Sequence, residues 1–214
     1  KDPELQANAI HMLGISSNQP SIDLLADLYR ESDSIDVKNA VIQAYMIGDE
    51  SGELVEILTG LLKTEKDPEL QMNIIRTLGL MDATDELKAL YPTLKDNETK
   101  AAVLEAYFLA GDTQILRQVL ETETNPELRS TAIQGIAMED DEGASALLES
   151  LYDNATTIEE KKVILESLVM MDDAQDFALK IVRTETEVEL QRDAIHMLGV
   201  MEAPEELSDL YASV

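Results

Sequence analysis

Two histidines, His11 and His196, are the first candidates for chemistry, because imidazole serves both as a catalytic base and as a metal ligand. They occupy the same place in two copies of the phrase AIHMLG, at 9–14 and 194–199. Other copies of this phrase hold Gln, Arg or Glu there, so we expect both side chains to face solvent. They are too far apart in the chain to share a metal ion.

Two acidic stretches, MEDDEG at 138–143 and MDDAQD at 171–176, are the next candidates, because calcium binds oxygen-rich loops. Neither stretch has the alternating spacing of a calcium-binding loop. Acidic residues are also favoured at the start of a helix, where they cap exposed N–H groups. We therefore interpret both stretches as helix starts and expect no metal.

The six tyrosines fall at regular places in the chain. Two interpretations follow: each ring fills a gap in the core while its hydroxyl meets a carbonyl or solvent, or the hydroxyls form a ladder along a groove. We favour the first. The tyrosines are Tyr29, Tyr45, Tyr91, Tyr107, Tyr152 and Tyr211.

Composition excludes several functions. The 214 residues include 44 acidic and 16 basic side chains, for a net charge of −28. Binding a phosphate backbone or an anionic lipid surface requires an excess of Lys and Arg, so we expect neither nucleic acid nor membrane as partner. No apolar run approaches the ~18 residues of a membrane span. The absence of cysteine excludes thiolate nucleophiles, disulfides and cysteine-based metal sites.

Repeats explain the regular spacing. The phrase DPELQANAIHMLG at 2–14 returns as DPELQMNIIRTLG, NPELRSTAIQGIA and EVELQRDAIHMLG, with weaker relatives between them. The period is close to 30 residues, which is typical of a solenoid. The sequence predicts seven units in one array over 1–214, at about 1–33, 34–66, 67–95, 96–124, 125–156, 157–186 and 187–214.

Each unit reads as two helices. Counting from the anchors Leu5, Val37, Leu70, Thr99, Leu128, Glu160 and Leu190, apolar residues fall at +4, +5, +8 and +10, and we expect them to form one buried stripe. Asp-Pro or Asn-Pro marks the start of the first helix, and glycine lies near its end. We expect Asp82 and Asp112 to cap second helices. Odd units carry Leu-x-x-Leu-Tyr in the second helix, whereas even units carry Lys38, Lys100 or Lys161 in the first.

These residues resemble the HEAT-repeat family, especially the short bacterial HEAT-like repeats that also occur in phycobilisome-lyase-like proteins. The resemblance implies an all-α, right-handed α-solenoid of seven hairpins and about fourteen helices, with the second helices on the concave side. The family's arginine after Glu-Leu is kept only as Arg129, and Gln6, Gln71 and Gln191 replace it. The family's ladder between neighbouring repeats is therefore expected to be mostly absent.

The second helices supply the candidate partner surface. Opposite their leucine stripe, a helical wheel places 11 acidic and 6 basic residues, a less acidic mixture than the whole chain. These residues are Asp23, Asp27, Arg30, Glu53, Glu56, Lys63, Asp85, Lys88, Arg117, Glu121, Glu149, Asp153, Asp176, Lys180, Arg183, Glu205 and Asp209.

We therefore expect a non-catalytic scaffold that binds a protein or peptide, with no cofactor. The alternative is an enzyme accessory or lyase-like HEAT protein that holds a small molecule. A HEAT-like DNA-repair protein would need a basic groove, and the excess of acidic residues argues against one. Because Lys1 already lies inside a repeat, we also expect a longer array, or an end that packs against another molecule, including end to end against another copy.

Overall fold

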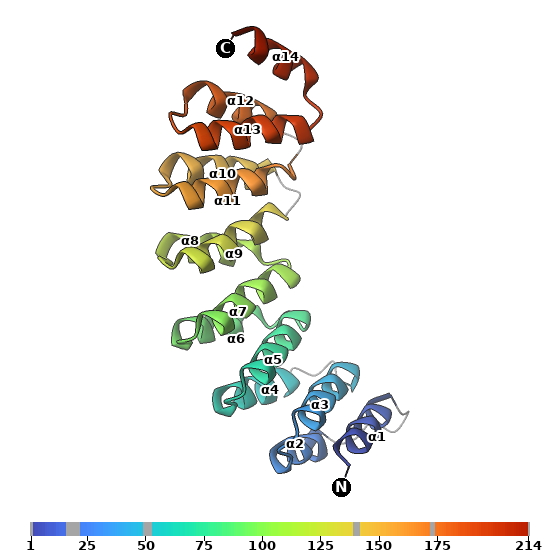
Figure 1. Ribbon diagram of the computed structural model, residues 1–214. Helices are drawn as coiled ribbons and strands as arrows, with labels where there is room; N and C mark the ends of the chain where they lie inside the picture. The colour runs from blue at the N-terminus through green and yellow to red at the C-terminus, as the bar shows by residue number, and fades with distance from the viewer. Residues whose placement is uncertain (1, 16–21, 49–52, 139–141, 172–173, 214) are drawn as a thin grey trace. The chain divides into compact units, whose positions relative to one another are not determined.

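A computed structural model describes residues 2–15, 22–48, 53–138, 142–171 and 174–213. Within these ranges the chain forms fourteen α-helices and one short 3-10 turn, with no β-strand. None of the helices found there is long and apolar enough to cross a membrane. The prediction of an all-α protein with about fourteen helices is confirmed (Figure 1).

The helices alternate between first and second members of hairpins. They are α1 (Pro3–Ile15), α2 (Ile22–Glu31), α3 (Ile35–Gly48), α4 (Glu53–Thr64), α5 (Pro68–Leu80), α6 (Thr84–Leu90) with η1 (Tyr91–Thr93), α7 (Asn97–Leu109), α8 (Thr113–Thr122), α9 (Pro126–Ala137), α10 (Glu142–Asn154), α11 (Ile158–Leu168), α12 (Gln175–Thr184), α13 (Val188–Val200) and α14 (Pro204–Ser213).

Side-chain caps start the first helices as predicted. The Asp67 carboxylate accepts hydrogen bonds from the backbone N–H groups of Glu69 and Leu70 at 3.0 and 3.2 Å. Asn125 caps α9 in the same way. A proline follows each cap, where its missing N–H costs nothing because the first turn leaves those donors unpaired within the helix.

The prediction that Asp82 caps the second helix of its hairpin is wrong. Asp82 has a positive φ of 57° and lies one residue before the N-cap of α6, which is Ala83 without a side-chain cap bond. Its N–H donates to the Gly79 carbonyl, and the Ala83 N–H donates to that of Leu78. Asp82 therefore closes α5 rather than capping α6, because aspartate tolerates the left-handed conformation that this turn requires.

The chain divides into two compact units, Lys1–Asp112 and Thr113–Val214. In the first unit the first helices pack in a row, α1 on α3, α3 on α5 and α5 on α7, while α2 packs on α3 and α4 on α5 (Figure 1). In the second unit α9, α11 and α13 form the equivalent row, and α8, α10 and α12 each pack on the first helix that follows them. First helices inside a row, such as α3, α5 and α11, are thus covered by a first helix on each side.

The core lies between the two layers of helices. Ile74, Ile75 and Leu78 of α5 are fully buried, as their +4, +5 and +8 positions predict. The +10 residues were predicted to join them, and this is wrong. They are exposed wherever the structure describes their side chains: Ile15, Leu80, Leu109, Met138, Met170 and Val200. The side chain of Ile47, the remaining +10 residue, lies outside the described part.

Helix geometry explains the exposure at +10. Two residues beyond +8 turn an α-helix by about 200°, so the +10 side chain points away from the buried stripe. It lies on the outer side of the first helix, the side that also carries His11, His196 and Arg76, all three of them exposed. The prediction that both histidines face solvent is confirmed.

Gly79 near the end of α5 has a packing role that its position alone did not indicate. A Cβ atom at this residue would lie 2.7 Å from the Cβ of Ala106 and 2.9 Å from its backbone Cα and O. Helices α5 and α7 therefore approach closely at a glycine–alanine contact, which leaves no room for any side chain.

Candidate functional site: the second-helix surface and the joints between hairpins

The charged residues predicted on the second helices lie mostly at the surface. Arg117 and Glu149 are half-buried, and the other members of the predicted set are exposed. The leucines on the opposite side of the same helices, such as Leu58, Leu116 and Leu148, are fully buried. The amphipathic pattern thus separates a packing side from a charged side, as the helical wheel predicted.

Several of the basic residues in this set contact neighbours in the same chain. Arg30 pairs with Asp27 at 3.1 Å, and Lys180 pairs with Asp153 at 2.9 Å while lying 5.0 Å from the centre of the Phe177 ring. The Arg117 guanidinium donates to the Gly143 carbonyl at 3.3 Å. These contacts are solvent-accessible and worth little to stability.

Lys63 on α4 and Arg183 on α12 differ from those residues. Both are exposed, and neither forms an ion pair or hydrogen bond with another residue of the described part. They are therefore the basic side chains of the second helices that are most available to an acidic group of a partner.

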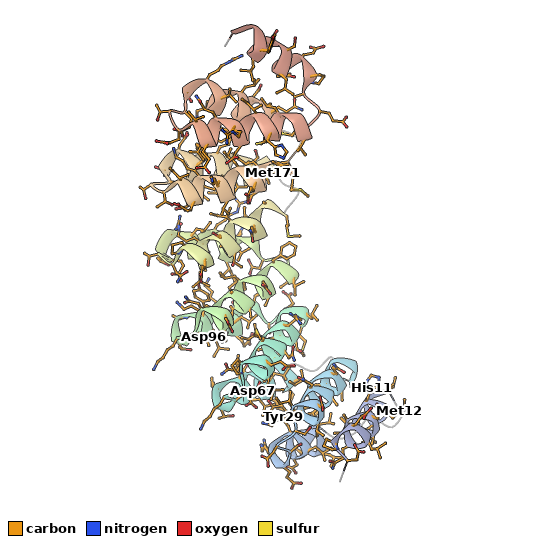
Figure 2. The ribbon with its side chains drawn as sticks, viewed as in Figure 1. His11, Met12, Tyr29, Asp67, Asp96 and Met171 are labelled. Carbon is orange, nitrogen blue, oxygen red and sulfur yellow. The ribbon has the colours of Figure 1, made fainter. Side chains whose placement is uncertain are left out.

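The joint between the first and second hairpins holds a partly buried cluster of three polar side chains, Tyr29, Lys38 and Glu65. Tyr29, at the end of α2, donates its hydroxyl to Glu65 Oε2 at 2.6 Å (Figure 2 labels Tyr29). Lys38 Nζ donates to the same oxygen at 3.0 Å and lies 4.9 Å from the centre of the Tyr29 ring. One carboxylate thus joins two successive hairpins.

The same cluster recurs in the second unit with Tyr152, Lys161 and Glu185. Glu185 Oε2 accepts from the Tyr152 hydroxyl at 3.1 Å and from Lys161 Nζ at 2.7 Å. Lys161 lies 4.9 Å from the centre of the Tyr152 ring. Phe177 of α12 meets that ring edge-on at 5.4 Å between centroids. The recurrence shows that the cluster is a property of the odd-to-even joint.

The other oxygen of each glutamate orders the linker to the next hairpin. Glu65 Oε1 accepts from the backbone N–H groups of Lys66 and Asp67, and Glu185 Oε1 from that of Thr186 at 2.8 Å. The carbonyl of each glutamate then accepts from the side-chain amide of a glutamine in the next first helix, Gln71 or Gln191, at 2.8 Å. Glutamine thus ties each linker to the helix that follows.

These contacts shift the pKa values of the glutamates and tyrosines. Burial alone raises the pKa of Glu65, but the hydrogen bonds from Tyr29, from backbone N–H groups and from Lys38 outweigh it and lower the value to about 2. The hydrogen bond from Lys161, aided by backbone N–H groups and Tyr152, lowers the pKa of Glu185 to about 2 against the opposing effect of burial. Burial and the neighbouring glutamate raise the pKa of both tyrosines well above its usual range. Each glutamate is therefore charged and each tyrosine neutral near pH 7.

The prediction that the tyrosine rings lie in the core holds for Tyr45 and Tyr107 but not for Tyr211. Tyr45 is buried and donates to the Ile22 carbonyl at 3.3 Å, as expected. Lys100 lies 5.1 Å from the centre of the half-buried Tyr91 ring, so this joint repeats the lysine contact. Tyr107 is buried, and its hydroxyl has no hydrogen-bond partner in the described part. Tyr211, by contrast, is 90% exposed.

The sequence contains the three residue types of each cluster, but it does not show that they are in contact. Tyrosine, lysine and glutamate each recur at a fixed place in the repeat. The partners are 24 to 36 residues apart, as in Lys161–Glu185 and Tyr29–Glu65, so local periodicity does not join them. The glutamates lie just after α4 and α12, within the polar phrases EKD and ETE.

Both acidic stretches lie partly outside the described residues. Residues 139–141 and 172–173 of the candidate calcium loops lie outside the described residues. Among the residues that the structure describes, no group of three or more His, Asp or Glu side chains is placed to hold a metal ion.

The repeated hairpins and their joints define the class of the chain, an all-α helical repeat protein. When the sequence is compared with protein-family models and with curated proteins, nothing matches. The resemblance to HEAT repeats therefore rests on the repeated residues of this chain.

Proposed function

We propose that the protein is a non-catalytic scaffold that binds a protein or peptide along its second helices. The observation that carries this proposal is the row of exposed charged residues on those helices, of both signs, that the core does not use. Lys63 and Arg183 support it most directly, since both are exposed and form no ion pair or hydrogen bond in the described part. A surface of mixed charge favours a polar partner surface of complementary charge.

The exposed +10 residues on the first helices form a competing surface. Single exposed apolar side chains are common on folded proteins, so this row does not by itself indicate a partner. It supplies the control for the proposal, because it lies on the side of each hairpin that points away from the core.

The test is affinity capture of the partner with charge-reversed variants. The triple variant Arg30→Glu, Lys63→Glu and Arg183→Glu should keep its thermal melting curve but lose the partner, because these side chains are exposed. Arg117 is left unchanged, since it is half-buried and donates to a carbonyl. Variants of the outer surface, Arg76→Glu and Leu80→Ser, should keep full binding. Loss of the partner in the outer-surface variants, with binding kept in the triple variant, would overturn the proposal.

A further inference from the structure

The seventh hairpin, α13 with α14, exposes residues whose equivalents are buried or half-buried in the other odd hairpins. Tyr211 is 90% exposed, whereas Tyr29 is 4% and Tyr152 is 2% exposed. In those two hairpins an even hairpin of the same chain covers the tyrosine, and Lys38 or Lys161 lies over its ring. No residue of the described part plays this role for Tyr211.

The first helix of the seventh hairpin shows the same difference. Ile195 is 43% exposed, while the equivalent Ile75 and Ile133 are fully buried. Nothing lies within 4 Å of a Cβ placed on Gly199, whereas one placed on the equivalent Gly79 would collide with Ala106. Both differences lie on the side where the odd helices of the other hairpins meet an even first helix.

We propose that Ile195, Gly199 and Tyr211 form a docking surface for one further helical hairpin of the even type. That hairpin brings a lysine over the Tyr211 ring and a carboxylate to its hydroxyl. A small residue of its first helix meets Gly199.

The even hairpins of this chain define the chemistry of the occupant. Their first helices carry a small residue seven places after the anchor, namely Ala44, Ala106 and Ser167, and each is buried. Ala106 is the residue that meets Gly79. Each of these helices carries lysine one place after the anchor, and glutamate follows the paired second helix. The small residue would meet Gly199, the lysine would cover the Tyr211 ring, and the glutamate would accept a hydrogen bond from the Tyr211 hydroxyl.

A second copy of this chain offers a poorer match through its first hairpin. Helix α1 does present an apolar face, with Leu5 at 67% and Met12 at 65% exposed. However, Gln6 occupies the place that Lys38 has in α3, so an odd hairpin set against another odd hairpin leaves Tyr211 without a lysine. The alternation of hairpin types therefore favours an even hairpin over end-to-end pairing of two copies.

The test extends the chain with a copy of its own even hairpin. Val214 lies three residues after Tyr211, as Ala155 lies three after Tyr152, so a copy of residues 156–187 added after Val214 reproduces the natural spacing. The control adds a copy of 66–97, an odd segment of equal length. Nitration of each tyrosine by tetranitromethane, followed by mass spectrometry, measures exposure, with the buried Tyr29 and Tyr152 as internal references.

We expect Tyr211 to react at least tenfold more slowly in the even extension than in the 214-residue chain, and the odd extension to give no such protection. Gly199→Ala should restore the reactivity of Tyr211 in the even extension, because the added methyl blocks the close approach. The same change in the 214-residue chain should not lower its melting temperature, since the site is open.

Four results would overturn the proposal. The first is equal reactivity of Tyr211 with and without the even hairpin. The second is an added even hairpin that circular dichroism shows to be unfolded. Another is equal protection by the odd extension. The last is protection of Tyr211 in the 214-residue chain that rises with concentration as dimers form in sedimentation equilibrium, because the occupant would then be a second copy.

Discussion

Replacing Glu185 by Gln should remove a pH-dependent part of the stability. The ordinary pKa of 4.5 falls to about 2 in the folded chain, a difference of 4.5 − 2 = 2.5 units. At 1.36 kcal/mol per unit this corresponds to about 3 kcal/mol. Because the folded-state pKa is depressed, the contribution is complete above the unfolded-state pKa and is lost as the pH falls toward 2.

The assay is urea unfolding followed by circular dichroism at a series of pH values. At pH 7 the Glu185→Gln variant should be less stable than the wild type by about 3 kcal/mol, and the difference should shrink toward zero as the pH falls from about 5 to about 2. Glu121→Gln on α8 is the matched control, because that side chain is exposed. The reasoning fails if the Glu185→Gln difference is the same at every pH, or if it is absent at pH 7.

Other predictions concern packing and charge. Gly79→Ala should destabilise the chain by about 1–3 kcal/mol in urea unfolding, since the new methyl meets the backbone of Ala106. Gly60→Ala, on an open face of α4, should instead stabilise the chain by about 0.5–1 kcal/mol. The opposite order of stability would refute the close contact at Gly79. Leu148→Ala should lower the free energy of unfolding by about 2–5 kcal/mol because it leaves a cavity. Tyr152→Phe should lower it by only about 1–2 kcal/mol because it removes one hydrogen bond. Equal losses of stability in the two variants would contradict this ranking. Fluorescence anisotropy should detect no binding to duplex DNA at moderate salt, and a micromolar affinity that weakens steeply with salt would refute the charge argument.

Much of the fold was readable from the sequence because its signals are local. Asp67 and Asn125 each precede a proline and an apolar stripe, and both cap the helices predicted for them. The stripe itself identified Ile74 and Leu78 as core. Capping and amphipathicity act within one helix, so one sequence is enough to show them.

The errors come from geometry that the apolar pattern does not contain. Leu80 is apolar but lies about 200° around the helix from Leu78, so it is exposed. Asp82 resembles an N-cap, yet the turn between α5 and α6 requires a residue with positive φ there. Residue type alone fixes neither the direction of the Leu80 side chain nor the backbone conformation of Asp82.

The candidate site was predictable in its exposure but not in its contacts. A helical wheel is enough to place Lys63 and Arg183 at the surface. The clusters around Glu65 and Glu185 join residues of different hairpins, and only the packing of those hairpins brings them together. Gly79 was read as a helix end, whereas its role depends on Ala106 of the next hairpin.

The most direct test of the scaffold proposal is site-specific photo-crosslinking of the chain to its captured partner. A photoreactive residue is placed singly at Lys63 or Arg183 on second helices, or at Arg76 or Leu80 on the outer side of α5, four positions that are exposed. We predict strong crosslinks from the two second-helix positions and weak ones from the two outer positions. Strong crosslinks from Arg76 and Leu80, with none from Lys63 and Arg183, would contradict the proposal that the partner binds along the second helices.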